Sequence, residues 1–348
     1  MRRIRRSVWI ATLITSQWLS LSRAAAIAAR DGDLPAPPEQ DSPAAWTKFW
    51  SRVTRQTFGG AQLWADELVY GHWRIQRSAL SGNYRLLDSN ECRRACGSFE
   101  DCQQALDAAK VSESLSSGHR RVIVLLHGLW GWRQHMGPMH RYLQRRLDAD
   151  VISVGYPSSR GDLNSHAASL AKVIDHLQGV EQLDFVAHSM GNVVLRCWLM
   201  NEYESQRADR PQIGRIVMLG PPNNGSAAAR FWHGGPASRL AILVAGRSAR
   251  QLGPGWSTVV DRLATPACEF GVIAGGLNDD EGFSPRLPGD DDGVVEVETT
   301  RLAGARDFLL LPVWHPLMMM HPQVQESTLR FLEQGCFISE EARVPIED

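Results

Sequence analysis

A serine near the middle of the chain has the surroundings of a nucleophile. The segment Phe185-Val186-Ala187-His188-Ser189-Met190-Gly191-Asn192 lies between an apolar run and a helical pattern. A serine on a sharp strand-to-helix turn exposes its hydroxyl at the carboxyl edge of a sheet, and the next backbone N–H points at a bound carbonyl oxygen. Ala187 and Gly191 are small enough to let such a turn close. The segment therefore predicts Ser189 as a nucleophile and the Met190 N–H as one donor to an oxyanion.

A serine hydroxyl is a weak nucleophile at neutral pH, so it needs a histidine base and a carboxylate that orients the histidine. On such a turn the acid and then the base follow the serine along the chain. Three histidines follow Ser189, namely His233, His315 and His321. His315 comes directly after the last apolar run, so its loop would bring it to the sheet edge. We predict His315 as the base in preference to His321, which is expected to start the final helix, and His233 as a surface or lid residue.

The acid is expected in the loop after the apolar run 270–274. The loop holds Asp279, Asp280, Glu281, Asp290, Asp291 and Asp292. Asp292 is preferred because it precedes Gly293-Val294-Val295, where a tight turn would fix the carboxylate. The other acidic residues are expected to form a solvated loop. A calcium site is the alternative for them, although their spacing is not that of a regular calcium loop.

A second oxyanion donor is expected in the loop His127-Gly128-Leu129-Trp130-Gly131-Trp132, which follows the apolar run 122–126. The glycines permit close approach of the backbone, and the N–H of Leu129 is the natural partner of the Met190 N–H. His127 is expected to brace this loop. His188, beside the nucleophile, is expected to point elsewhere and to be structural.

Strands and helices alternate from residue 121 onward. The apolar runs predict strands at 122–126, 151–154, 183–187, 213–219, 270–274 and 308–313, and helical patterns predict helices at 138–147, 165–177 and 190–203. Continuous apolar strands separated by helices indicate a parallel sheet covered on both faces. The fold class is therefore α/β, with one doubly wound, mostly parallel sheet.

Four further segments complete the expected organisation. Residues 27–68 are predicted as a linker and an amphipathic helical arm, in which Trp46, Phe49, Trp50 and Val53 share one face. That face either docks on the main domain or contacts a membrane surface. The main domain is predicted over 69–337, opens with an antiparallel hairpin of 69–77 and 83–87, and is followed by a tail at 338–348. Residues 227–263 interrupt the alternation and are expected to form a helical insertion, either a lid or surface helices.

The first 26 residues have the three parts of an export signal: a basic start, an apolar stretch and a run of alanines. An uncleaved membrane anchor and a leader without function are the alternatives. Export to the periplasm or medium would permit disulfides among the six cysteines. Cys92, Cys96 and Cys102 lie close together, which favours a local disulfide over a metal site, and Cys197 is expected to be a buried small hydrophobe.

Composition excludes several other classes. The chain has 348 residues, 43% hydrophobic and 22% charged, which is typical of a globular protein. It carries 37 basic and 38 acidic residues, and the part after the leader is mildly acidic. Because a nucleic-acid partner requires a basic surface, no nucleic-acid binding is predicted.

These motifs together resemble the α/β-hydrolase superfamily, and specifically its lipase-like branch with an A-H-S-M-G serine turn. Gly220-Pro221-Pro222-Asn223-Asn224-Gly225-Ser226 resembles the loop after the nucleophile helix in those lipases, with Pro221 where threonine is common. Asp292-Gly293-Val294-Val295 resembles the acid motif, and His315 with the helix after it resembles the histidine motif. The resemblance covers about residues 69–337.

The resemblance implies hydrolysis of carboxylic esters through an acyl-enzyme on Ser189, with no cofactor and no metal. The substrate would be a small-molecule ester, and tryptophans beside the motif loops favour a lipid-like or aromatic one. They are Trp130, Trp132, Trp232, Trp256 and Trp314. Two alternatives remain open: an acyltransferase that uses the same three residues, and a binding protein that keeps the fold without activity.

Overall fold

The computed structural model describes residues 58–113, 118–207, 209–225 and 246–347. The predicted leader, residues 27–57 of the predicted linker and arm, and most of the predicted insertion, including Trp232 and His233, lie outside the described residues. Residues 58–68, at the end of the predicted arm, form a 3₁₀ helix followed by the start of a strand. Within the described ranges, no helix has the length and apolar character that a membrane span needs.

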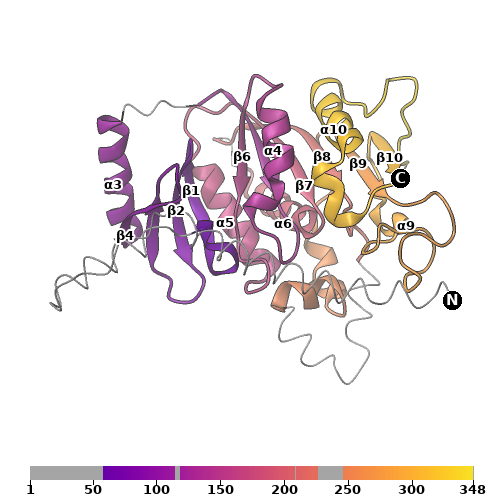
Figure 1. Cartoon of the computed structure of the whole chain (residues 1–348), viewed down its shortest axis with the longest axis horizontal. Helices are drawn as coiled ribbons and strands as arrows, with labels where there is room; N and C mark the ends of the chain where they lie inside the picture. Colours follow the sequence, from indigo (N-terminus) through magenta and orange to yellow (C-terminus); the bar gives the residue numbers. More distant parts are fainter. Residues whose placement is uncertain (1–57, 114–117, 208, 226–245, 348) are drawn as a thin grey trace, which may run out of the picture. The chain divides into compact units, whose positions relative to one another are not determined.

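The centre of the fold is a six-stranded, wholly parallel sheet in the order β10-β9-β8-β7-β5-β6 (Figure 1). Its strands are β5 (Arg121–Leu126), β6 (Asp150–Val154), β7 (Gln182–His188), β8 (Gln212–Leu219), β9 (Phe270–Gly275) and β10 (Asp307–Leu311). All six expected strands are therefore present. The central strands are buried on both faces, which explains why they read as continuous apolar runs.

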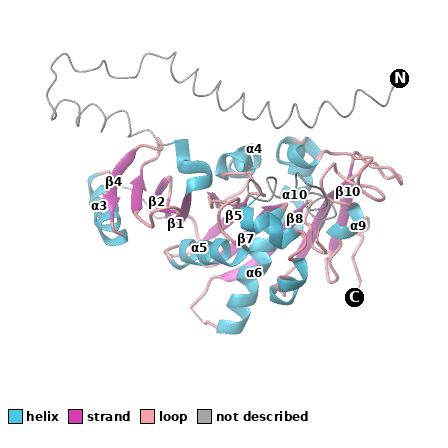
Figure 2. Ribbon diagram, turned by 90° about the horizontal axis from the view of Figure 1, so that it is seen from below, coloured by secondary structure: helices cyan, strands magenta, loops and turns pink. Residues whose placement is uncertain are grey.

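Helices cover both faces of this sheet, as Figure 2 shows. The helices are α4 (Gly137–Gln144), α5 (Leu163–Asp175), α6 (Met190–Ser205) and α10 (Pro322–Gln334). Alternate residues of β5 divide between the two cores: Val122 and Val124 pack with α5 and α6, whereas Ile123 and Leu125 pack with α4 and α10. The doubly wound α/β fold is confirmed.

The other helices of the described ranges include one that packs on the N-terminal sheet and several short ones in the loops. They are α3 (Phe99–Ser112), α9 (Val297–Thr300) and the 3₁₀ helices η1 (Phe58–Leu63), η2 (Arg133–Met136), η3 (Trp256–Thr258), η4 (Val260–Arg262) and η5 (His315–Met320). Of the predicted insertion, the described part includes η3 and η4, which agrees with its mixed helical pattern.

The N-terminal region is a four-stranded antiparallel sheet, larger than the predicted hairpin. Its strands are β1 (Trp64–Tyr70), β2 (Trp73–Ser78), β3 (Tyr84–Leu87) and β4 (Arg93–Gly97), in chain order. The β2–β3 hairpin is confirmed, but 69–77 is not one strand because the chain reverses at Gly71, where φ is +55°. The sequence analysis predicted neither strand β4 nor helix α3. Strand β4 was missed because Arg93-Arg94-Ala95-Cys96-Gly97 shows no apolar alternation. Helix α3 packs over this sheet and starts with a capping box of Ser98 and Asp101.

A buried ion pair joins this sheet to the end of β6. Asp66 is fully buried, and its Oδ2 accepts hydrogen bonds from Arg74 Nη1 and from the N–H of Gly155, both at 2.7 Å. The N–H of Asp66 donates to the carbonyl of Gly155 at 2.8 Å. Burial alone would raise the pKa of Asp66, but Arg74, Arg133 and the hydrogen bonds lower it overall. The carboxylate therefore stays charged and holds the two sheets together.

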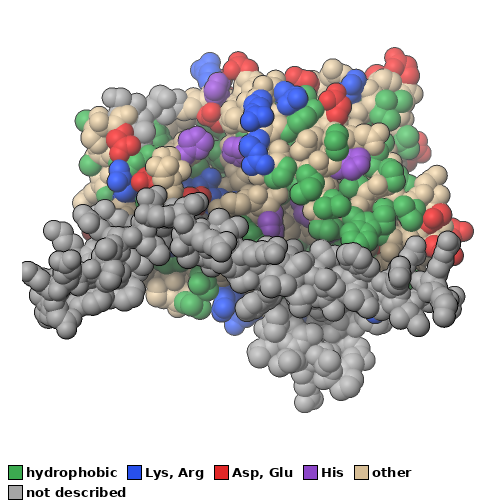
Figure 3. All heavy atoms as spheres, in the orientation of Figure 1, with side chains coloured by type: hydrophobic (Ala, Val, Ile, Leu, Met, Phe, Trp, Pro, Cys, Tyr) green, Lys and Arg blue, Asp and Glu red, His purple; other side chains and the backbone are tan. Residues whose placement is uncertain are grey.

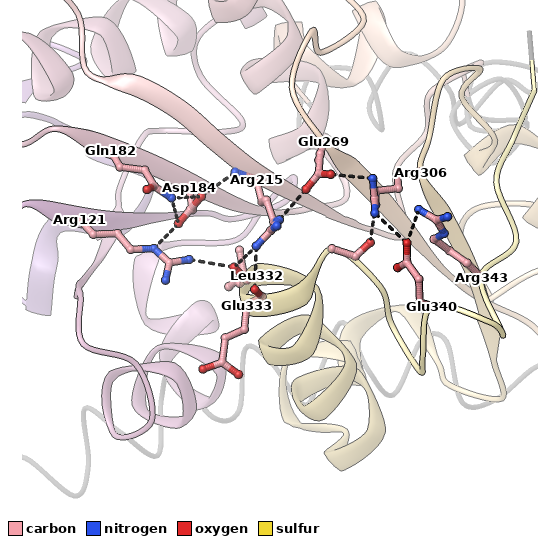
Figure 4. Close-up of polar contacts among 11 residues, drawn as sticks. Arg121, Gln182, Asp184, Arg215, Glu269, Arg306, Leu332, Glu333, Glu340 and Arg343 are labelled. Carbon is pink, nitrogen blue, oxygen red and sulfur yellow. Dashed lines mark hydrogen bonds and ion pairs between the residues drawn. The ribbon is translucent and has the colours of Figure 1, made fainter.

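A second polar network runs along the start of the parallel strands (Figure 4). Arg121 Nε pairs with the buried Asp184 at 2.6 Å, and Glu269 binds Arg215 Nε and Arg306 Nη1, each at 2.7 Å. Arg121 and Arg215 also donate to the carbonyl of Leu332 near the C-terminal end of α10. Cations at this end of a helix satisfy its unpaired carbonyls and its dipole. The network thus fixes α10 to the sheet at the edge opposite the strand ends.

The C-terminal segment is packed against the start of β10. Asp307 accepts hydrogen bonds from the N–H groups of Phe337 and Val344, at 2.7 and 2.9 Å. Ile346 exchanges two backbone hydrogen bonds with Gly304 and Ala305. The end of the chain is thereby tied to the outermost strand.

Replacing Arg74 with methionine should lower the free energy of unfolding by about 3–5 kcal/mol, because it leaves the Asp66 carboxylate buried without its cation. Equilibrium urea unfolding measures this change. Arg330→Met is the matched control, since the Arg330–Glu326 pair is solvent-exposed, and it should cost less than about 1 kcal/mol. Equal losses in the two variants would contradict the role given to the Asp66 pair.

Candidate active site

Ser189 lies on a strained turn between β7 and α6. Its φ is +55° and its ψ is −128°, a backbone conformation that residues other than glycine rarely adopt. The Ser189 N–H donates to the carbonyl of Leu219 at 2.9 Å, and both the backbone N–H and Nδ2 of Asn192 donate to the carbonyl of Ser189 at 3.0 Å. These hydrogen bonds hold the turn. The predicted strand–turn–helix context of this serine is therefore present.

His315 and Asp292 form a close, buried pair. Nδ1 of His315 lies 2.6 Å from Oδ2 of Asp292, and both side chains are buried. Oδ1 of Asp292 accepts the N–H groups of Val294 and Val295 at 3.0 and 2.8 Å, as the predicted tight turn requires. The N–H of His315 donates to the carbonyl of Asp292 at 2.9 Å. A carboxylate at Nδ1 places the proton there, so Nε2 of His315 is left as an acceptor.

Two glycines allow close approach of the backbone to residues of the site. If Gly220, which follows β8, carried a Cβ atom, that atom would lie 3.0 Å from Nδ1 of His315 and 3.1 Å from Oδ2 of Asp292. A Cβ on Gly128, after β5, would lie 2.8 Å from Cβ and 3.3 Å from Oγ of Ser189. The loops after β5, β7, β8 and β10 therefore converge at one edge of the sheet.

The loop that follows β5 is braced as expected. His127 is buried, stacks on Tyr156 with ring centroids 4.0 Å apart, and donates from Nδ1 to the carbonyl of Gly128 at 2.9 Å. Burial lowers the pKa of His127 to about 3, so the ring stays neutral. The N–H of Gly131 closes a turn on the carbonyl of Gly128. Leu129 lies inside this turn, and its N–H has no hydrogen-bond partner among the described residues.

Sequence reasoning missed one residue that holds this loop. Gln62, in η1, donates to the carbonyl of Gly131 at 2.5 Å and accepts the N–H of Ser159 at 2.8 Å. It therefore links the loops after β5 and β6. No motif marks Gln62, because its role depends on a contact between segments 69 residues apart.

His188 does not point away from the site, so that expectation was wrong. Its Nε2 lies 3.1 Å from the carbonyl oxygen of His315, and the two imidazole rings are 4.6 Å apart at 41°. The last residue of β7 is thus in direct contact with the base that the sequence predicted.

The acidic loop is only partly solvated, which corrects the expectation for Asp291. Asp291 is fully buried, and its Oδ1 accepts the N–H groups of Gly293 and Ser284 at 2.6 and 3.1 Å. Asp290 accepts the N–H groups of Leu277 and Asn278. These two carboxylates organise the loop that carries Asp292. Among the described residues, no group of three His, Cys, Asp or Glu side chains is placed to hold a metal ion.

The tryptophans are placed unequally around the site. Trp130 and Trp314 are 39% and 37% exposed, and Trp314 packs edge-on against Phe283. Trp132 is half-buried and packs at a tilt against the His135 ring, and Trp256 lies against Gly225. Leu317 and Met320, which follow Trp314 in η5, are also exposed. Figure 3 shows hydrophobic side chains gathered in this region.

Two further expectations concern single residues. His321 begins α10 as its N-cap, although its side chain makes no capping hydrogen bond, and Cys197 is buried in α6. All six cysteines are free thiols, so the expected local disulfide among Cys92, Cys96 and Cys102 is not formed.

Comparison with known proteins agrees with this architecture. The sequence profile described as the alpha/beta hydrolase family matches residues 123–337, so the chain belongs to that family. Membership of this family supports a hydrolase function. No curated protein matches the chain.

Among solved structures, the chain is similar to the mature form of the lipase BlEst2 from Bacillus licheniformis, with 20% identity and a TM-score of 0.46. The match covers 60% of this chain and 88% of that one. Phospholipase PlaB from Legionella pneumophila is 17% identical with a TM-score of 0.47, covering 63% of this chain and 60% of that one. The metagenomic carboxyl esterase MGS0156 is 15% identical with a TM-score of 0.40, covering 63% and 77%.

Gly220→Ala should slow reaction of Ser189 with a fluorophosphonate by at least about tenfold, because the added methyl displaces the His315 and Asp292 side chains. Gly179→Ala is the matched control: Gly179 also has a positive φ, +70°, but a Cβ there meets nothing within 4 Å. Both variants should lose about 1 kcal/mol of stability through backbone strain. A normal labelling rate in Gly220→Ala would contradict the close approach described above.

Asp291 should make stability depend on pH. Burial raises the pKa of Asp291 from 3.8 to about 6, so the folded state binds more protons than the unfolded state between these values. The free energy of unfolding should therefore decrease as the pH rises from about 4 to about 6. Asp291→Asn keeps the Oδ1 acceptor and cannot titrate. Relative to this variant, the wild type should lose about 1–3 kcal/mol across that range in urea titrations, and parallel pH profiles would contradict the assignment.

Proposed function

We propose that the protein is a serine hydrolase that cleaves carboxylic esters through an acyl-enzyme on Ser189. The observation that carries the proposal is the buried His315–Asp292 pair at 2.6 Å, which lies beside the strained serine turn. His188 precedes the serine and touches His315, which makes His315 a neighbour of the nucleophile. The family match adds that the fold is one used by hydrolases.

In the proposed reaction, Nε2 of His315 takes the proton of the Ser189 hydroxyl as its oxygen attacks the ester carbonyl. Asp292 holds the Nδ1 proton of His315, so the ring presents Nε2 to the serine, and it stabilises the imidazolium that forms. The imidazolium then gives its proton to the leaving alcohol. Water attacks the acyl-enzyme with His315 again as base, and the acid is released.

The negative charge on the tetrahedral intermediate would be held by the N–H groups of Leu129 and Met190. Met190 is the first residue of α6, and the N–H groups of the first helical turn have no acceptor within the helix. The positive end of the helix dipole adds to this attraction. The braced loop at 127–131 and the strained turn fix the two donors before the substrate binds, which is what makes such stabilisation effective.

For the substrate we propose a lipid-like or aromatic ester, bound near Trp130 and Trp314. Both indole rings are more than a third exposed beside the loops of the site. Exposed aromatic and aliphatic side chains around a reactive centre suit an apolar acyl group. We further propose that residues 1–26 act as an export signal, on the strength of their sequence.

Labelling of the purified full chain with a fluorophosphonate, followed by ester hydrolysis assays, tests the proposal. Ser189→Ala should abolish both signals. Asp292→Asn should lower kcat by about 10⁴-fold, because an amide in place of the carboxylate favours the wrong tautomer of His315. Asp280→Asn, in the exposed part of the same loop, should leave both signals unchanged.

Each outcome has a distinct meaning. A folded wild type that takes up no label would indicate a protein that keeps the fold without activity. Product analysis separates the remaining alternatives, since free acid indicates a hydrolase and a new ester indicates an acyltransferase.

A further inference from the structure

His188 makes contacts that the proposed reaction does not use. The residue ends β7, and its backbone is paired in register with Leu219 of β8. Its side chain reaches across to the loop after β10, where Nε2 lies 3.1 Å from the carbonyl oxygen of His315. A carbonyl oxygen can only accept, so Nε2 of His188 must carry a proton. The two rings also pack against each other, with centroids 4.6 Å apart.

The other side of the His188 ring faces the loop after β5. A Cβ on Gly128 would lie 3.4 Å from Nδ1 of His188 and 3.3 Å from Oγ of Ser189. One imidazole therefore lies between the loop with the proposed base and the loop with the proposed oxyanion donor. It is also covalently adjacent to the proposed nucleophile.

His188 is neutral in this setting. Burial and the neighbouring His315 lower the pKa of His188 well below its usual value. The groups that face it are the ring and carbonyl of His315, Gly128 and, farther away, His135 and His127. A neutral ring does not repel the imidazolium that His315 becomes during the reaction, whereas a second cation there would oppose its formation.

We propose that His188 is a positioning residue, which fixes the orientation of His315 through the hydrogen bond to its carbonyl and through ring contact. This inference rests on the function proposed above. A misplaced base weakens proton transfer in the transition state but leaves ground-state binding of the ester intact. Loss of the contact should therefore lower kcat while KM stays nearly constant.

The test compares His188→Phe with His188→Gln in the full chain. Phenylalanine keeps the ring and removes the donor, whereas the Nε2 amide of glutamine can occupy the position of the imidazole Nε2. We expect His188→Phe to lower kcat on a soluble p-nitrophenyl ester about tenfold, the effect of losing roughly one hydrogen bond. KM should stay within about twofold, and His188→Gln should recover most of the loss.

Two further readouts separate positioning from a loss of folded protein. Exhaustive fluorophosphonate labelling should still reach one label per chain in His188→Phe, but at a lower rate. The downfield proton resonance of the His315–Asp292 hydrogen bond should shift or broaden in His188→Phe and be retained in His188→Gln. His140→Phe is the matched control, because His140 is also a neutral, half-buried histidine whose ring nitrogen lies within hydrogen-bond distance of Ser153.

Unchanged kcat in His188→Phe, or equal losses in the phenylalanine and glutamine variants, would overturn the proposal. Failure of the proposed serine hydrolase function would give a different result. In that case the wild type itself takes up no label, or Ser189→Ala keeps the esterase activity.

Discussion

Every loop of the proposed site begins where a parallel strand ends. Because β5, β7, β8, β9 and β10 run in the same direction and in register, the segments after them meet at one edge of the sheet. The buried apolar faces of these strands fix their register, since a shift by one residue would turn each side chain to the opposite face. The relative positions of the loops that carry Ser189, Asp292 and His315 thus follow from packing of the sheet.

The two edges of the sheet carry different kinds of polar group. At the start of the strands, ion pairs such as Arg121–Asp184 and Arg215–Glu269 are satisfied by opposite charges and by carbonyls of α10. At the end of the strands, Nε2 of His315 and the N–H of Leu129 have no hydrogen-bond partner within the part of the chain that the structure describes. The first arrangement stabilises the fold, and the second lies at the edge where we propose that the substrate binds. Backbone strain at Ser189 lies at the second edge as well.

Much of this arrangement could be predicted from the sequence, because strand and helix periodicities determine where motifs lie on the fold. The six parallel strands and the pairing of His315 with Asp292 follow from apolar runs, chain order and a tight turn at Gly293. Contacts between distant segments have no such local signal. Which loops meet in three dimensions determines the roles of Gln62, Asp66 and His188. It also determines the burial of Asp291. Short polar elements such as β4 were missed for the same reason, since neighbouring strands and α3 hold them in place.

The outermost strands of the parallel sheet are both partly covered. At β6, the Asp66 N–H and the Arg74 side chain occupy the carbonyls of Gly155 and Ser153. At β10, the last residues of the chain pair with the segment that leads into the strand. An uncovered edge strand offers a row of free N–H and C=O groups on which a second molecule can add a strand of its own. The N-terminal sheet shortens that row at the end of β6, and the C-terminal segment pairs with the chain just before β10, which limits where a second molecule could add a strand.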